Sequence, residues 1–195
     1  FLLELAHKLH RRTANWAGGV PDWHGVNFAQ AFREPATYAS LTRDPSQIAA
    51  TERDYRTMRD KYGDVPGGLY GADENARPGF DDPRQAAETC AMVEMMLSDE
   101  LLLCQTGDPR WAERCEDVAF NSLPASMTPD LKALHYLTSP NMARSDAESK
   151  SPGIQNGGPM FLFDPRDHRC CQHNVSHGWP YFCLLYTSPS PRDQR

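Results

Sequence analysis

Hydrophobic residues recur every three to four positions along much of the chain, the pattern expected of helices with one buried face. Residues 1–11 predict the end of one helix. Residues 24–41 predict a second helix, which Pro35 should kink or interrupt because proline cannot continue the helical hydrogen bonds. Three further helices are expected at residues 45–62, 91–105 and 110–123. The pattern therefore predicts an all-α chain.

The same turn signal follows two of the predicted helices. Asp44-Pro45 follows the first, and Asp108-Pro109 follows the second. In this arrangement the aspartate can cap the next helix, and the proline fits its first turn. Two helix pairs with matching turns predict repeated αα-hairpins, arranged either as a closed toroid or as an open solenoid.

Two long loops connect these predicted helices, at residues 63–83 and 138–169. Both are too long for a tetratricopeptide-type array, and loops of this length in a compact domain are usually functional or disordered. The second loop contains Phe161 and Phe163, which suggests that it is ordered against a core.

The two ends of the chain differ from its middle. Residue 1 already lies inside a segment whose apolar residues have helical spacing. We therefore expect residues 1–182 to form one domain that is cut at both ends. Residues 183–195 change abruptly to a Ser/Pro string that resembles a translated sequencing-library adapter. We expect this segment to be a non-native tail, and a natural flexible tail is the alternative.

Composition narrows the class of protein. The 195 residues include 20 Lys and Arg against 26 Asp and Glu, a formal net charge of −6, which argues against a protein that follows nucleic-acid phosphates. No apolar stretch approaches the roughly 20 residues that a membrane-spanning helix needs. We therefore expect neither a nucleic-acid nor a membrane partner.

The cysteines favour a metal site over a disulfide framework. Outside residues 183–195 their number is odd, and the neighbours Cys170 and Cys171 would form a strained ring if they bonded to each other. Together with Glu88 and Cys90 they make four ligands of the kinds that zinc takes. The spacing fits no standard zinc finger, so a set of buried, inert cysteines is an equal alternative. Cys104 and Cys115 are expected to pack in the core.

A glycine-rich stretch leads into paired carboxylates at Asp73 and Glu74. A phosphate-binding P-loop is not expected, because no Lys with Ser or Thr follows the glycines. Either carboxylate could serve as a general acid/base, whereas a solvated turn is the simpler interpretation of such a pair.

Several short sequence motifs together resemble those of the catalytic domain of glycoside hydrolase family 127, which is typified by retaining β-L-arabinofuranosidases. They cover about residues 20 to 182 in the family's order: GGLYGADE, QAAETC followed by EMM, TGDPRW, AFNSLPASMTPD, LHYLTSPNM, RCCQHN and GWP. The resemblance implies part of an (α/α)6 barrel, normally followed by β-sandwich domains. It also implies an L-arabinofuranoside, a small carbohydrate, as substrate.

The resemblance implies roles for five residues. Cys170 matches the family's cysteine nucleophile, which also binds zinc, and Glu74 matches its acid/base carboxylate. Glu88, Cys90 and Cys171 match the other zinc ligands. Zinc coordination would supply the thiolate that a free thiol at neutral pH mostly lacks, and two displacements would retain the anomeric configuration.

Three further residues match sugar-contacting positions of the family: His24 in an HGVN phrase, Glu116 and Tyr136. Each has a plainer alternative. Tyr136 could be a core aromatic residue, Glu116 a solvated helix residue or arginine partner, and His24 a surface group.

The spacing of Glu88 and Cys90 conflicts with shared ligation if both lie in one helix. Residues two apart in a helix point about 200° away from each other around its axis. We therefore predict that residues 84–89 are irregular, or that the regular helix begins close to Thr89.

Two other kinds of protein are weighed against the glycosidase. In the first, zinc merely ties distant loops together in a helical interaction module without catalysis. In the second, a sugar epimerase on a similar helical toroid uses paired histidines. The localisation and oligomeric state stay open, although a zinc–thiolate site suits a reducing cytoplasm.

Overall fold

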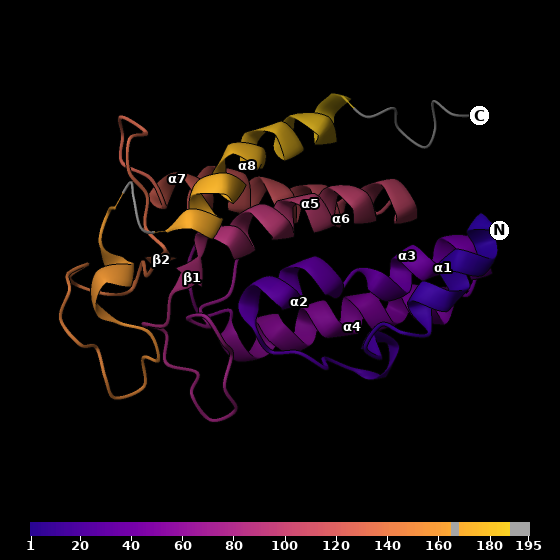
Figure 1. The fold of residues 1–195 in the computed structure, drawn as a ribbon, viewed down its shortest axis with the longest axis horizontal. Coiled ribbons are helices and arrows are strands. Elements are labelled where there is room, and N and C mark those ends of the chain that lie inside the picture. The colour runs from indigo at the N-terminus through magenta and orange to yellow at the C-terminus, as the bar shows by residue number, and fades with distance from the viewer. Residues whose placement is uncertain (165–167, 188–195) are drawn as a thin grey trace.

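The chain folds into packed helices with one very small sheet (Figure 1). The computed structural model describes residues 1–164 and 168–187. In chain order the elements are α1 Leu2–His10, η1 Trp16–Gly18, α2 Gly25–Ala31, α3 Glu34–Thr42, α4 Pro45–Tyr62, β1 Ala87–Glu88, α5 Thr89–Thr106, α6 Arg110–Asp117, η2 Val118–Ser122, α7 Leu123–Ala125, β2 Leu137–Thr138, η3 Gly158–Phe161 and α8 Arg169–Thr187. The mostly helical class predicted from the periodicity is confirmed.

The matching turns begin helices as predicted. Asp44 accepts a hydrogen bond from the backbone N–H of Ser46 at 2.9 Å, and Pro45 is the first residue of α4. Asp108 accepts one from the N–H of Arg110 at 3.0 Å, where α6 begins. Helix α3 packs against α4, and α5 packs against α6. The αα-hairpins are therefore confirmed.

The structure refines three of the sequence predictions. The break at Pro35 is present, because α2 ends before it and α3 begins with Pro35 in its first turn. The helix expected at residues 110–123 is divided, since a π-helical turn, η2, follows α6 before α7. Helix α8 was not anticipated, and it extends through Thr187 into the segment expected to be a tail. Residues 188–195 of that segment lie outside the described residues, and its origin stays a prediction.

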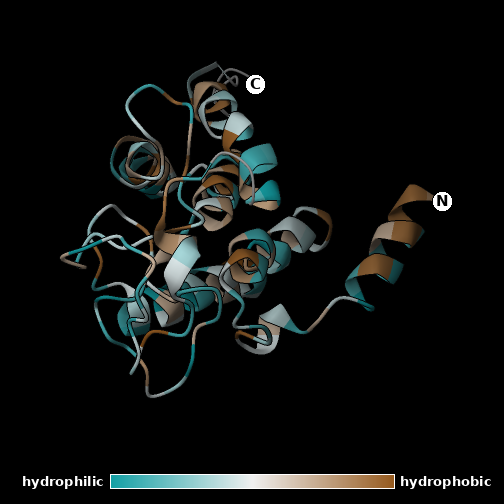
Figure 2. Cartoon of the chain, turned by 60° about the vertical axis from the view of Figure 1, so that its left-hand side comes forward, coloured by the Kyte–Doolittle hydropathy of each residue, from teal (hydrophilic) through white to brown (hydrophobic). Residues whose placement is uncertain are grey.

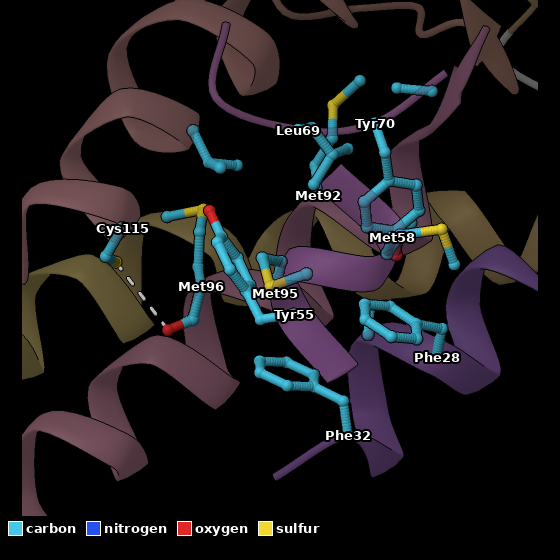
Figure 3. Close-up of a cluster of buried hydrophobic side chains, with 14 of the residues drawn as sticks. Phe28, Phe32, Tyr55, Met58, Leu69, Tyr70, Met92, Met95, Met96 and Cys115 are labelled. Carbon is cyan, nitrogen blue, oxygen red and sulfur yellow. Dashed lines mark hydrogen bonds between the residues drawn. The ribbon is translucent and has the colours of Figure 1, made fainter. Parts of the chain in front are cut away.

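Helix α5 forms the centre of the core. It packs against α2, α6 and α8 and is buried on nearly all sides, which explains why its hydrophobic residues favour no single face. Met92, Met95 and Met96 lie in a cluster with Phe28 and Phe32, whose rings stack at 5.2 Å (Figure 3). Burying one such side chain contributes about 1.5–3 kcal/mol.

Cys104 and Cys115, which were expected in the core from the sequence, differ in environment. Cys115 is buried and its thiol donates to the carbonyl of Met96 at 3.7 Å, as the dashed line in Figure 3 shows. Cys104 is exposed on α5, so the expected core position was wrong for this residue. Cys104 ends the apolar run Leu101, Leu102, Leu103 of α5, so its position in the sequence did not show that it faces outward.

Helix α1 lies at the edge of the molecule and carries exposed hydrophobic residues (Figure 2). Its contacts with α3 include a hydrogen bond between His7 and Tyr38 at 2.8 Å and a stacked pair of His10 and Tyr38 rings. Within the described ranges, no helix has both the length and the apolar character needed to cross a membrane.

Candidate active site

Four side chains from distant parts of the chain converge at one end of α5. Glu88, Cys90, Cys170 and Cys171 each offer one ligand atom, and these four atoms lie within 4.8 Å of one another. The sulfur of Cys171 is 3.5 Å from that of Cys90 and 3.9 Å from that of Cys170. A disulfide bond measures about 2.05 Å, so these are free thiols. We call this group the thiol cage.

The cysteines lie in the first turns of two helices that pack together. Cys90 is the second residue of α5, and Cys170 and Cys171 follow the first residue of α8. The amino end of a helix carries partial positive charge, which favours a thiolate there. In the absence of a cation, burial followed by the charge of Cys90 nevertheless raises the pKa of Cys170. Cys171 and Cys90 are buried, whereas Cys170 is exposed and can meet a substrate.

Glu88 reaches the cage because it lies outside the helix. It belongs to β1, which pairs antiparallel with β2, and its backbone is extended with φ −78° and ψ 138°. Helix α5 begins at Thr89, whose N–H donates to the carbonyl of Tyr136 at 3.0 Å. The prediction that the regular helix starts close to Thr89 is confirmed, and the angular conflict between Glu88 and Cys90 is removed.

The electrostatics of the thiol cage fit a bound cation. Glu88 is 3% exposed, and its Oε2 atom is buried without a hydrogen-bond partner among the described residues. Burial, followed by the charge of Cys90, raises the pKa of Glu88 to about 8. A hydrogen bond from Cys171 lowers the pKa of Cys90 to about 7. Buried acidic groups with an unpartnered oxygen could therefore hold a metal ion.

Glu74 lies beside the cage and is surrounded by polar groups. The Tyr136 hydroxyl donates to its Oε1 atom at 3.3 Å, and the Asn156 amide donates to its Oε2 atom at 3.3 Å. The Nε2 atom of His24 is 3.7 Å from Oε1. Tyr136 also packs against the cluster that contains Cys90 and Cys171, so this side chain lies between Glu74 and the thiol cage.

Backbone contacts set the position of Glu74. Its carbonyl accepts a hydrogen bond from the N–H of Gly25 at 2.9 Å, and its neighbour Asn75 forms a bridge with His24. The preceding glycines permit close packing: a Cβ atom at Gly71 would lie 2.4 Å from the carbonyl oxygen of Gln85. The glycine-rich stretch therefore positions the Glu74 carboxylate.

The structure gathers most of the site residues expected from the sequence. His24 and Tyr136 both contact Glu74, and Tyr136 also packs against the cluster that contains Cys90 and Cys171. Glu116 lies exposed on α6, outside these contacts, and its role stays a prediction. Asn156 was not selected from the sequence because an asparagine in a long loop with glycines is typical of an ordinary turn.

A comparison with protein families gives one match. Residues 1–183 match "Beta-L-arabinofuranosidase, GH127 catalytic domain". The chain belongs to glycoside hydrolase family 127. The resemblance carried by the sequence motifs is thereby confirmed, and the mostly helical fold agrees with a part of this family's barrel-like domain. Neither the curated proteins nor the solved structures contain a significant match.

Membership of family 127 limits the class of reaction that the chain can be expected to support. It supports a glycoside hydrolase of the β-L-arabinofuranosidase type, which acts on a carbohydrate. The epimerase interpretation is set aside, because the matched family is one of hydrolases. The side chains at the site supply an exposed thiol, a nearby carboxylate and a cage that could hold a metal ion.

Proposed function

We propose that this chain supplies the active site of a retaining β-L-arabinofuranosidase in which Cys170 is the nucleophile and Glu74 the acid/base. The observation that carries the proposal is the connection through Tyr136. Its hydroxyl donates to Glu74, and the same side chain packs against the cluster that contains Cys90 and Cys171, so the carboxylate lies beside the thiol cage. Retaining glycosidases need such proximity, with the two reacting groups about 5 Å apart.

Zinc is the metal that best suits the cage. Three thiolates and one carboxylate, from Cys90, Cys170, Cys171 and Glu88, would hold it in the four-coordinate manner that zinc prefers. When bound, zinc would keep the Cys170 sulfur ionised at neutral pH and fix its orientation. The unpartnered Glu88 oxygen supports this assignment, since a cation would provide its missing partner.

Two displacements account for hydrolysis with retention. In the first, the Cys170 sulfur bonds to the anomeric carbon while the glycosidic C–O bond breaks, and Glu74 donates its proton to the departing oxygen. In the second, Glu74 takes a proton from water as the water oxygen attacks the same carbon and the C–S bond breaks. Each displacement inverts the carbon, so the product keeps the β-configuration.

The groups around Glu74 suit these two roles. Tyr136 and Asn156 donate to separate oxygens of its carboxylate, which limits rotation of the group. His24 and Tyr136 lie where they can contact a sugar bound between Glu74 and Cys170, as the family resemblance implies. A zinc staple without catalysis would need no carboxylate beside the cage, so the position of Glu74 favours the enzyme.

The covalent step can be tested directly in the intact enzyme. Glu74→Gln should slow breakdown of the intermediate more than its formation from an aryl β-L-arabinofuranoside with an acidic phenol. We expect mass spectrometry of the zinc-loaded variant to find a pentosyl group on the peptide that contains Cys170.

The control is Cys104→Ser, which changes an exposed thiol away from the cage and should leave hydrolysis intact. Cys170→Ser in the Glu74→Gln background should show no adduct. If zinc binds but neither an adduct nor hydrolysis of any arabinofuranoside is found, the non-catalytic staple replaces the enzyme proposal.

A further inference from the structure

A short segment of the second long loop, residues 153–156, is held against the first long loop by hydrogen bonds. The carbonyl of Gly153 accepts hydrogen bonds from Arg77 at 3.0 Å and from Gln85 at 3.2 Å. The next residue, Ile154, is buried in a small apolar cluster that includes Phe161. This segment therefore has a defined position, although the loop around it is long.

Asp73 joins the two loops through a single carboxylate. Its Oδ1 atom accepts the N–H of Ala86 at 3.0 Å, and its Oδ2 atom accepts the N–H of Gln155 at 2.8 Å. Arg77 lies 3.5 Å from Oδ2. Asp73 is 1% exposed and adopts a left-handed backbone with φ 51°, a conformation that aspartate and asparagine tolerate better than most residues.

The residues that follow these two partners are themselves in contact. Glu74 follows Asp73, Asn156 follows Gln155, and the Asn156 amide donates to Glu74. We propose that Asp73 is a positioning residue for the acid/base, holding residues 153–156 so that Asn156 orients the Glu74 carboxylate. This inference rests on the proposed function, because it gives Asp73 a role through Glu74.

The chemistry explains why orientation matters here. Glu74 has to present one oxygen first to the departing glycosidic oxygen and then to a water molecule at the same place. Tyr136 and Asn156 hold separate oxygens of the carboxylate, so losing one contact frees it to rotate. Misplacement of a catalytic group by about 1 Å can reduce the rate about 100-fold.

The test compares substrates that differ in their need for an acid. An alkyl β-L-arabinofuranoside has a poor leaving group that requires a proton, whereas an aryl glycoside with an acidic phenol requires little help. The variants are Asp73→Asn, which tolerates the left-handed backbone but cannot accept both N–H groups, and Asn156→Ala. The control is Glu148→Gln, an exposed carboxylate of the same loop.

We expect kcat/KM of both variants to fall about 10- to 100-fold for the alkyl glycoside and less than about 3-fold for the aryl glycoside. A purely structural role would lower both values equally, and an equal loss overturns the inference. Glu74→Gln is measured in parallel. If its loss is also equal for the two substrates, the acid role proposed for Glu74 fails; if only Glu74→Gln shows the split, the role of Asp73 fails alone.

Hydrogen exchange provides a readout that does not depend on activity. The side chain of Gln155 is exposed, yet its backbone N–H donates to buried Asp73. We expect exchange at this amide to accelerate at least about 10-fold in Asp73→Asn and to stay unchanged in Glu148→Gln. Unchanged exchange in Asp73→Asn would show that Asp73 does not hold the segment.

Discussion

The middle and the amino end of α5 are stabilised by different physical effects. Its middle packs Met92, Met95 and Met96 among aromatic rings, and no charge is needed there. Its amino end carries Cys90 next to Glu88, where acidic groups are buried together. The middle depends on filled volume, whereas the amino end depends on charge balance. The comparison shows how one helix connects a tightly packed core with a chemically reactive site.

Removing the metal should have the largest effect on stability, and the local loss of structure should be limited to the amino end of α5. A ligand present at about 1,000 times its dissociation constant stabilises a protein by about 4 kcal/mol, so a chelator should lower the unfolding free energy of the zinc-loaded protein by a similar amount. Denaturant unfolding with and without chelator measures this change.

Hydrogen exchange sharpens the same comparison. After chelation, amides in the first turns of α5 and α8 should lose the most protection, while amides near Met95 should lose no more than the fall in global stability explains. Cys104→Ser should respond as the unaltered protein does, and Cys171→Ser should show little response to zinc. Equal stability with and without chelator would contradict a metal in the cage.

A cavity in the middle of α5 should lower the unfolding free energy by a similar amount but leave the cage intact. Met96 is completely buried, so Met96→Ala should lower the unfolding free energy by about 2–5 kcal/mol. Met96→Leu, which nearly conserves volume, should cost less than about 1.5 kcal/mol. Zinc affinity, measured by competition with a chelating dye, should stay within about 3-fold of the original value in both variants. A larger loss of affinity in Met96→Ala would show that the two regions are not separate.

The smallest effect concerns pH and His135, a buried residue whose carbonyl accepts a hydrogen bond from Thr89 at the start of α5. Burial, followed by the charge of His168, lowers the pKa of His135 to about 4. The unfolded chain binds this proton near pH 6.5 and the folded chain does not. Stability from His135 is therefore present above pH 6.5 and lost as pH falls toward 4.

Between pH 6.5 and 5 this difference amounts to about 2 kcal/mol. Urea unfolding of the metal-free protein at pH 7 and pH 5 should show the loss, and His135→Gln should reduce it. A loss of the same size in His135→Gln would assign the acid sensitivity to other groups.

The sequence predicted much of the helical framework because local signals specify it. Asp44 caps α4 and Pro45 is its first residue, as expected. At the second turn Asp108 accepts from the N–H of Arg110, but Pro109 stands directly before α6 and not in its first turn. The start of α5 was predicted from geometry alone, since Glu88 and Cys90 could share a metal only outside a common helix. Confirmation at Thr89 shows that a ligand set can locate a helix boundary.

Features that depend on long-range contacts were missed. Asn156 has no distinguishing neighbours in the sequence, and its position follows from a hydrogen bond between Asp73 and Gln155 across 82 residues. Helix α8 contains Pro180, which argues locally against a helix of this length. Its packing against α5 supplies stability that local propensity does not reveal.

The pairing of β1 with β2 has a consequence for how this protein tolerates change. In this two-residue ladder Glu88 stands opposite Leu137, and Tyr136 comes directly before β2. Because strand side chains alternate, inserting or deleting a single residue beside either strand would turn Glu88 or Tyr136 toward the opposite face. Libraries of length variants should therefore yield active members with insertions near residues 145–150 and almost none with insertions at residues 86–88 or 136–138.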